Sequence, residues 1–297
     1  MTWQVIVPGA VLRYRRPMLE ATHPLPARGT APRARRSFGE LLREWRQRRR
    51  MSQLDLAAEA EVSTRHLSFV ETGRSQPSRE MVLRLTERLD VPLRERNALL
   101  TAAGYAPLYR ERPLADPALA AARAAVERVL TGLEPCPAFA VDRHWRMVAH
   151  NRLVPPLLEG VAPGLLAPPV NVMRLSLHPQ GLAPRIVNLA QWRSHLIVRL
   201  HQQIEASADA TLQELLRELL DYPAPAAAAH AHDSEADAIV VPLQLATPAG
   251  VLAFFGTTTI FGTPVDVTLS ELAIESFFPA DAATAEALRR LAQSLAG

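Results

Sequence analysis

The sequence contains very little cysteine, no lysine and no long uncharged apolar run. Cys136 is the single cysteine among 297 residues, which excludes an internal disulfide and a metal site made of thiolates alone. No stretch of about 18 uncharged apolar residues occurs, because the best candidate, residues 153–172, contains Glu159 and several prolines. The N-terminal residues place an apolar patch before their charges, the reverse of a secretory signal. We therefore expect a cytoplasmic protein without a membrane span.

The charge is distributed unevenly along a chain of otherwise ordinary composition. Hydrophobic residues make up 48% and charged residues 21%, which is typical of soluble globular proteins. Residues 1–110 carry 20 arginines and 11 acidic residues (+9), whereas residues 111–297 carry 13 and 19 (−6). This asymmetry indicates a polyanion-binding module joined to a part that does not contact the polyanion.

The periodicity divides the chain into four parts. Residues 1–36 show no sustained periodicity and predict a basic, flexible arm, either functional or an artefactual extension, to which we assign no fold. Residues 37–103 predict five short helices, and residues 104–116, rich in Pro and Gly, predict a linker. Residues 117–297 predict an α+β domain with an antiparallel sheet and a closing helix. We expect its strands within residues 137–151, 238–247, 250–262 and 266–278.

The strongest motif lies in residues 52–78, where two helices are joined by a short turn. Ser52 and Ser63 are suited to begin these helices, and Gly73 to end the second. In such a helix-turn-helix the second helix enters the major groove, where base edges are distinguishable. The candidate DNA-binding residues are Gln53, Ser63, Thr64, Arg65, His66, Ser68, Phe69, Arg74 and Arg79.

These candidates differ in expected role. Arg65 can pair bidentately with guanine, while Gln53 points its amide toward a phosphate from the start of its helix. Arg74 and Arg79 can anchor the DNA backbone. Although Phe69 lies in the contacting region, we interpret its ring as a packing group rather than a base-stacking platform. The alternative is a helical core unit without a role in DNA binding.

The motif resembles the XRE/Cro/CI helix-turn-helix family. The resemblance is carried by Ser52, Gln53, Leu56, Ala57, Val62, Ser63, Glu71, Gly73 and Pro77. It implies that Glu71 is a structural residue near the helix end, and that Gln53 and the residues after Ser63 contact DNA.

A narrower resemblance extends over residues 37 to about 295. Residues 62–107, 137–151 and 171–200 resemble XRE regulators that carry an MmyB-like ligand-binding domain. The resemblance implies a PAS-like sensor and transcriptional control by a small molecule, such as a fatty acid or related apolar metabolite. It does not cover residues 1–36.

A PAS-like domain holds its ligand between the sheet and the covering helices. Candidates for an apolar lining are Trp145, Met147, Met173, Leu177, Trp192, Leu196, Phe254 and Phe255. Candidates for holding a carboxylate or polar head are Asn171, Arg174, His178 and Arg193. The alternatives are an ordinary core for the apolar residues and surface ion pairs for the arginines.

The sequence contains no pattern of catalytic or metal-binding chemistry. It has no GxSxG elbow, P-loop or GxGxxG after a strand, and neither His230 with His232 nor His195 with His201 makes a convincing metal site. We expect no enzymatic activity, metal or cofactor. The predicted partners are double-stranded DNA, a small-molecule effector and a second copy of the chain, because one recognition helix reads only a few base pairs. A C-terminal domain that only dimerises, as in a constitutive repressor, and an enzyme tethered to DNA stay open as alternatives.

Overall fold

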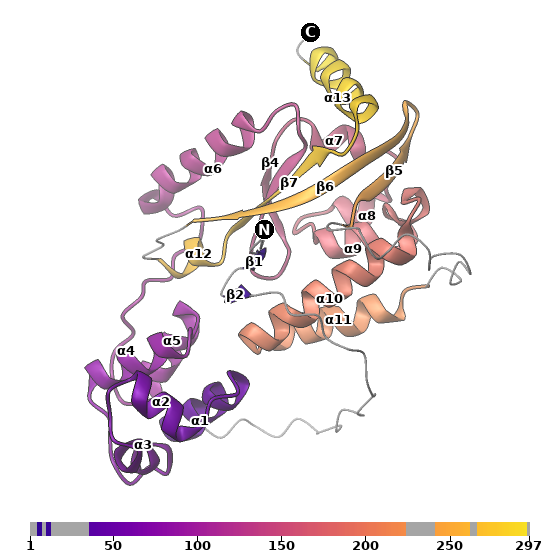
Figure 1. The fold of residues 1–297 in the computed structure, drawn as a ribbon. Coiled ribbons are helices and arrows are strands. Elements are labelled where there is room, and N and C mark those ends of the chain that lie inside the picture. The colour runs from indigo at the N-terminus through magenta and orange to yellow at the C-terminus, as the bar shows by residue number, and fades with distance from the viewer. Residues whose placement is uncertain (1–4, 8–9, 13–35, 224–240, 262–265, 296–297) are drawn as a thin grey trace. The chain divides into compact units, whose positions relative to one another are not determined.

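The computed structural model describes residues 5–7, 10–12, 36–223, 241–261 and 266–295. It divides into two compact units that separate after Glu111, with residues 266–267 belonging to the first unit. Figure 1 follows both units along the chain. Within the part of the chain that is described, no helix is both long and apolar enough to cross a membrane.

The described part of the first unit contains the five predicted short helices. They are α1 (Phe38–Arg48), α2 (Gln53–Glu59), α3 (Thr64–Glu71), α4 (Arg79–Arg88) and α5 (Leu93–Ala102). The first four begin after serines whose hydroxyl oxygens accept a hydrogen bond from a first-turn backbone N–H. The apolar sides of the helices meet in one core that contains Leu42, Leu56, Leu67, Leu85 and Leu99.

Two short strands lie within the N-terminal arm. β1 (Val5–Val7) and β2 (Ala10–Leu12) pair antiparallel, with Val5 opposite Leu12. These strands were not predicted from the sequence. The sequence Val-Ile-Val, followed by Pro-Gly and then Ala-Val-Leu, is a local strand-turn-strand pattern that the surrounding arginines obscure. Apart from Arg36, the remainder of the arm lies outside the described residues.

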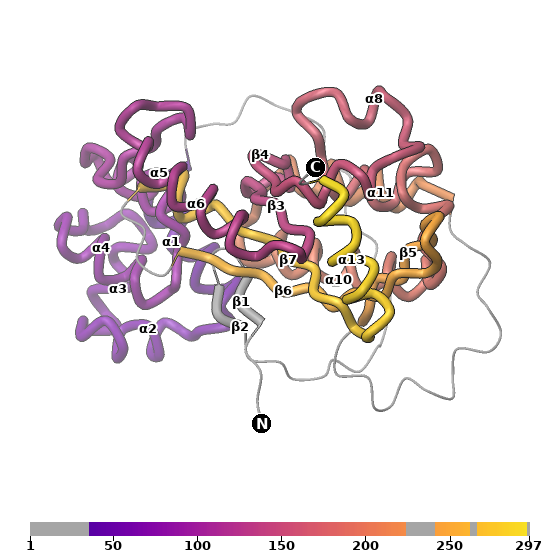
Figure 2. Tube along the Cα trace, turned by 90° about the horizontal axis from the view of Figure 1, so that it is seen from above, coloured from indigo at the N-terminus to yellow at the C-terminus, as the bar shows by residue number. Residues whose placement is uncertain are grey.

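The second unit is built on a five-stranded antiparallel sheet in the order β4-β3-β7-β6-β5. Its strands are β3 (Ala138–Val141), β4 (Met147–His150), β5 (Leu243–Thr247), β6 (Gly250–Ile260) and β7 (Ala273–Pro279). Figure 2 shows the sheet from above, with β4 and β5 at opposite ends. The fold class, helical domain followed by an α+β domain with an antiparallel sheet, is confirmed.

Helices cover both faces of this sheet, as Figure 1 shows. They are α6 (Ala120–Gly132), α7 (Val154–Leu157), α8 (Pro163–Leu166), α9 (Val172–Leu177), α10 (Leu189–Ser207), α11 (Ala210–Asp221) and α13 (Ala282–Ser294), with single 3-10 turns at Pro117–Leu119 and Ala183–Arg185. The larger core joins α9, α10 and α11 to one face, and a smaller core joins α6 to the other.

One predicted strand is shorter than expected. Residues 266–278 alternate like a single strand, but the structure has a helical turn, α12 (Val267–Ser270), before β7 begins at Ala273. The strand cannot extend further toward the N-terminus because Ala273 already pairs with the last residue of β3, Val141, and with the last residue of β6, Ile260. Alternation in one segment does not reveal where its partners end.

Candidate functional site

Helices α2 and α3 form the predicted helix-turn-helix. Ser52 and Asp55 make a reciprocal capping box at the start of α2, with N···O distances of 3.1 and 2.9 Å. Ser63 begins α3 by accepting a hydrogen bond from the His66 N–H at 3.2 Å. Between the helices, Glu61 adopts a left-handed backbone conformation (φ 56°), which makes the turn short.

Helix α1 holds the end of α3 through a buried ion pair. A Cβ atom at Gly39 would collide with the carbonyl oxygens of Val70 and Glu71, so only glycine permits this approach of α1 to α3. Arg46 of α1 donates two hydrogen bonds to the Glu71 carboxylate, at 2.6 and 2.9 Å. The side chains of Arg46 and Glu71 are only 10% and 2% exposed. The orientation of α3 is therefore fixed from its C-terminal end.

Glu71 also fixes Gln53 at the start of α2. The Gln53 side-chain amide donates to the second Glu71 carboxylate oxygen at 2.8 Å. Burial alone would raise the pKa of the Glu71 carboxyl, but the hydrogen bonds from Arg46 and Gln53 outweigh it and hold that pKa below its ordinary value. Glu71 thus has the structural role that the resemblance implies. One N–H of the Gln53 amide is engaged in the protein, which leaves the second for a phosphate.

The predicted base-reading residues lie on the side of α3 that faces away from the core of the first unit. Arg65 is exposed, and Thr64, Ser68 and Phe69 are half-buried, while Leu67 and Val70 face the core. The exposed arginines Arg74 and Arg79 lie after α3 and at the start of α4, respectively. The structure thus brings the predicted residues together on and around one helix. Ser63 and His66 are partly committed to capping it.

Most of the predicted apolar ligand residues form the larger core of the second unit. Within this core, Trp145, Met173, Leu177, Trp192, Leu196 and Phe254 are buried, and Met147 packs against them. Phe255 is not part of this core, in contrast to the prediction that grouped it with Phe254. Strand alternation places it on the face opposite Phe254, where it is 38% exposed and stacks on Phe278 at 5.5 Å between ring centroids.

The predicted polar head-group residues are engaged within the protein. The Asn171 side chain caps α9 and donates to the His144 carbonyl oxygen at 2.9 Å. Arg174 forms two hydrogen bonds of 2.7 Å with Glu218. Arg193 donates to the carbonyl oxygens of Leu219 and Leu220 at 2.9 and 3.0 Å, at the end of α11.

His178 is engaged in the same way, because its Nδ1 accepts from the Gln180 N–H at 3.0 Å. The structure therefore gives these four polar side chains local partners. Three of them meet around Tyr222: its hydroxyl donates to Glu218, the partner of Arg174, its ring centroid lies 5.0 Å from that of His178, and its carbonyl oxygen accepts from Arg193.

A buried ion pair that sequence reasoning missed lies between α10 and the sheet. Arg199 donates to both carboxylate oxygens of Glu275 on β7, at 2.9 and 2.6 Å, and to the Thr258 hydroxyl on β6 at 2.6 Å. Its guanidinium lies 4.6 Å from the ring centroid of Trp145. These residues are far apart in sequence, and no local pattern predicts their pairing.

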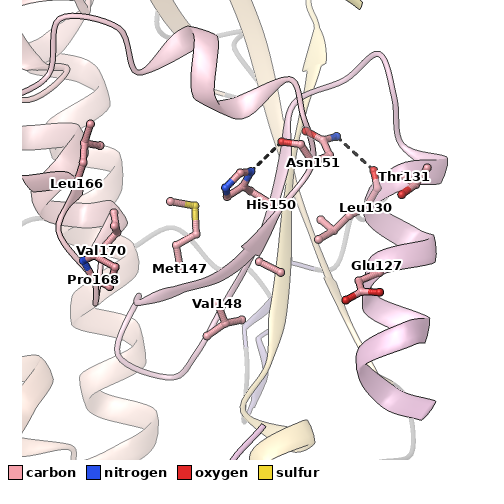
Figure 3. A pocket seen from close by; sticks show the side chains of 11 residues that line it. Glu127, Leu130, Thr131, Met147, Val148, His150, Asn151, Leu166, Pro168 and Val170 are labelled. Carbon is pink, nitrogen blue, oxygen red and sulfur yellow. Dashed lines mark hydrogen bonds between the residues drawn. The ribbon is translucent and has the colours of Figure 1, made fainter. Parts of the chain in front are cut away.

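The structure contains a cavity of about 500 Å³ beside the edge strand β4. Figure 3 shows its lining, which comes from three segments of the second unit. Apolar lining side chains are Leu130, Met147, Val148, Ala149, Leu166, Pro168 and Val170. Of the ligand residues predicted from sequence, Met147 is the one found here. The available signal was weak: β4 includes Val148, an exposed valine next to the partly buried Met147.

The polar lining of this cavity contains no arginine. Its polar members are Glu127, Thr131, His150 and Asn151. The Nδ1 of His150 lies 3.0 Å from the Asn151 carbonyl oxygen, which can only accept, so Nδ1 carries the proton and Nε2 is an acceptor in the neutral ring. Asn151 is buried and uses its amide to bond Leu130 and Cys136 carbonyl oxygens, at 3.2 and 2.8 Å.

Two family models match the chain. Residues 122–291 match the MmyB-like transcription regulator ligand binding domain, and residues 37–99 match a helix-turn-helix domain. The first match covers the sheet, the buried ion pair and the cavity, and the second covers α1 to α4 and most of α5. No curated protein matches the chain.

Proposed function

Because the chain belongs to the family with the MmyB-like transcription regulator ligand binding domain, and is thus a transcription regulator with a helix-turn-helix DNA-binding domain, we propose a specific division of work. Residues 37–103 bind an operator in double-stranded DNA as part of a homodimer. Residues 117–297 dimerise and hold a small apolar effector that changes operator affinity. The protein works in the cytoplasm and has no catalytic role.

The observation that carries the DNA-binding proposal is the anchoring of α3. Its C-terminal end is fixed by Arg46 and Glu71, and its other side presents Thr64, Arg65 and Ser68. A rigid helix with polar side chains at its N-terminal end fits the major groove, where Arg reads guanine and Ser or Thr contacts bases or phosphates. Arg74 and Arg79 supply phosphate contacts at the flanks.

Two variants of the full chain separate base reading from backbone attraction. Arg65→Ala should weaken operator binding by about 1–3 kcal/mol and leave binding to random duplexes nearly unchanged. Arg74→Ala should weaken both by similar factors and reduce the dependence on salt. The measurement is fluorescence anisotropy with an operator selected from a random duplex library. Equal losses on operator and random DNA for Arg65→Ala would remove this residue from direct readout.

Dimerisation places two recognition helices about 34 Å apart, one turn of DNA, so that two half-sites are read together. Native mass spectrometry of the purified chain tests this. A dimer, free or on a duplex with two half-sites, is expected. A strict monomer in both conditions contradicts the proposal.

The cavity beside β4 supports an apolar effector whose polar end is not an anion. Seven apolar side chains line it, and the charged side chain among its lining residues is the carboxylate of Glu127. Arg174 and Arg193, once candidates for a carboxylate head, are engaged with Glu218 and with α11 carbonyl groups. An acyl chain that ends in an alcohol, amide or ester suits this lining better than a free fatty acid, because a second carboxylate would be repelled by Glu127.

The effector site is tested by comparing native and denatured mass spectra. The wild-type chain should retain an additional small mass, and Val148→Asp should lose it, because a charge enters the apolar wall of the cavity. Val251→Asp is the matched control, since Val251 is an exposed valine on β6 that does not line the cavity. Retention by both variants would place the ligand elsewhere. Operator affinity that does not respond to the retained molecule would favour a constitutive repressor.

A further inference from the structure

Phe69 occupies an unusual position on α3. It lies one helical turn after Arg65 and is half-buried, yet it does not belong to the core formed by Leu67, Val70 and their neighbours in the first unit. The interpretation of Phe69 as a packing group stays a prediction, but the core of the first unit is not where its ring packs. Trp45 of α1, by contrast, is 4% exposed and belongs to the core.

The contact that Phe69 does make is with Arg65. The Arg65 Cζ atom lies 5.4 Å from the centroid of the Phe69 ring, within the range of a cation–π interaction. The two residues are four apart, so their side chains are neighbours on one side of the helix. Among the described residues, the Arg65 side chain has no hydrogen bond or ion pair with the protein. Its guanidinium is thus held by a ring face, and the N–H groups at its edge stay available.

The contact with Phe69 orients the Arg65 guanidinium so that it can donate two hydrogen bonds to a pair of coplanar acceptor atoms. A free arginine side chain loses considerable rotamer entropy when it is fixed, and contact with an aromatic ring reduces that loss before DNA binds. The O6 and N7 atoms of guanine are the matching acceptors in the major groove. When the guanidinium bonds to guanine, the Phe69 ring lies close to the next base pair, because neighbouring base pairs are only about 3.4 Å apart.

We propose that Arg65 and Phe69 read one dinucleotide step together, in which Arg65 bonds guanine and the Phe69 ring contacts the C5-methyl group of an adjacent thymine. The inference rests on the proposed DNA-binding function and names the base step that Arg65 and Phe69 recognise. Phenylalanine has no hydrogen-bonding group, so the thymine methyl is the base-edge feature that it can recognise. Phe69 is then both a specificity residue and the positioning residue for Arg65.

The experiment begins with site selection by the full chain from a random duplex library. The wild-type chain should select a guanine with a thymine beside it in each half-site. Phe69→Ala should keep the guanine and lose the preference for thymine, whereas Arg65→Ala should lose the guanine. Leu54→Ala is the matched control, since Leu54 is an exposed apolar residue of α2, and it should select the wild-type site.

The second step removes only the methyl group. Deoxyuridine in place of the selected thymine should weaken wild-type binding about 3- to 10-fold, a range expected for one apolar base contact, and should leave Phe69→Ala unchanged. This comparison uses the wild-type protein and so does not depend on how a variant folds. An equal effect of deoxyuridine on wild-type and Phe69→Ala, or a selected site without the guanine and thymine step, overturns the inference while DNA binding stands. A wild-type chain that selects no sequence overturns the proposed function as well.

Discussion

The buried pair of Arg46 and Glu71 should behave as one unit in the stability of the helical domain. Their side chains are 10% and 2% exposed and share hydrogen bonds of 2.6 and 2.9 Å. Glu71→Leu leaves the Arg46 guanidinium buried without its carboxylate, and we expect it to lower the free energy of unfolding by about 3–5 kcal/mol. Arg46→Met leaves the Glu71 carboxylate buried without its cation and should cost a similar amount.

The double variant Arg46→Met/Glu71→Leu should cost only about 0–2 kcal/mol, because no buried charge is left unpaired. The residual cost comes from Gln53 and the Met51 carbonyl oxygen, which lose partners at 2.8 and 2.9 Å. Hydrogen–deuterium exchange of the full chain, read in peptides from residues 37–103, measures this unit separately from the other.

The control for this cycle is Glu44→Gln, which breaks the partly exposed ion pairs of Glu44 with Arg36 and Arg48. It should change the free energy of unfolding by less than about 0.5 kcal/mol. If the double variant loses as much as the sum of both single variants, the two residues contribute independently. The view of the pair as a single desolvated anchor for α3 would then be refuted.

Two further predictions concern the second unit. Asn151→Leu should lower the free energy of unfolding by roughly 3 kcal/mol, because the Leu130 and Cys136 carbonyl oxygens and the Ala138 N–H lose their buried partner; denaturant titration measures this, and a loss below 1 kcal/mol would contradict it. The hydrogen bond from His144, at 2.9 Å, is the main cause that lowers the pKa of the Asp209 carboxyl. Because the folded pKa lies below the unfolded value of about 3.9, this stabilisation is present above pH 4 and is lost as the pH falls through the folded pKa. Unfolding measured between pH 4 and pH 2 should thus depend less steeply on pH in Asp209→Asn, and an unchanged slope would contradict this assignment.

The sequence predicted the helical unit well, because the residues that begin each helix are close to one another in the sequence. Ser52, Ser63 and Ser78 each cap a helix by bonding to an N–H three residues on. The start of β7 could not be found in this way, because it depends on where β3 and β6 end. A strand boundary that is set by where neighbouring strands end, one of them more than a hundred residues away, cannot be recognised from the residues of its own segment.

The ligand site was less predictable for a different reason. Apolar periodicity identifies a face that avoids water, but a packed core and an apolar cavity produce the same pattern. Trp192 and Phe254 follow that pattern and lie in the core, whereas Val148, on the short edge strand β4, lines the cavity. The distinction depends on whether a neighbouring element fills the space, and only the arrangement of α6, β4 and the segment around Pro168 decides this.

The arginines predicted to contact DNA differ from those predicted to hold a ligand in the partners that the fold already gives their guanidinium groups. In the second unit Arg174, Arg193 and Arg199 each bind a carboxylate or backbone carbonyl groups of the protein. In the described part of the first unit, the side chains of Arg65 and Arg74 form no hydrogen bond or ion pair with the protein and stay exposed. An arginine that the fold does not use is available to an external anion. An unpaired guanidinium alone does not define a polyanion-binding surface, because Arg128, Arg217 and Arg290 of the second unit are also exposed and have no side-chain hydrogen bond or ion pair among the described residues. The position of Arg65 on α3 and of Arg74 just after it is what favours DNA contact.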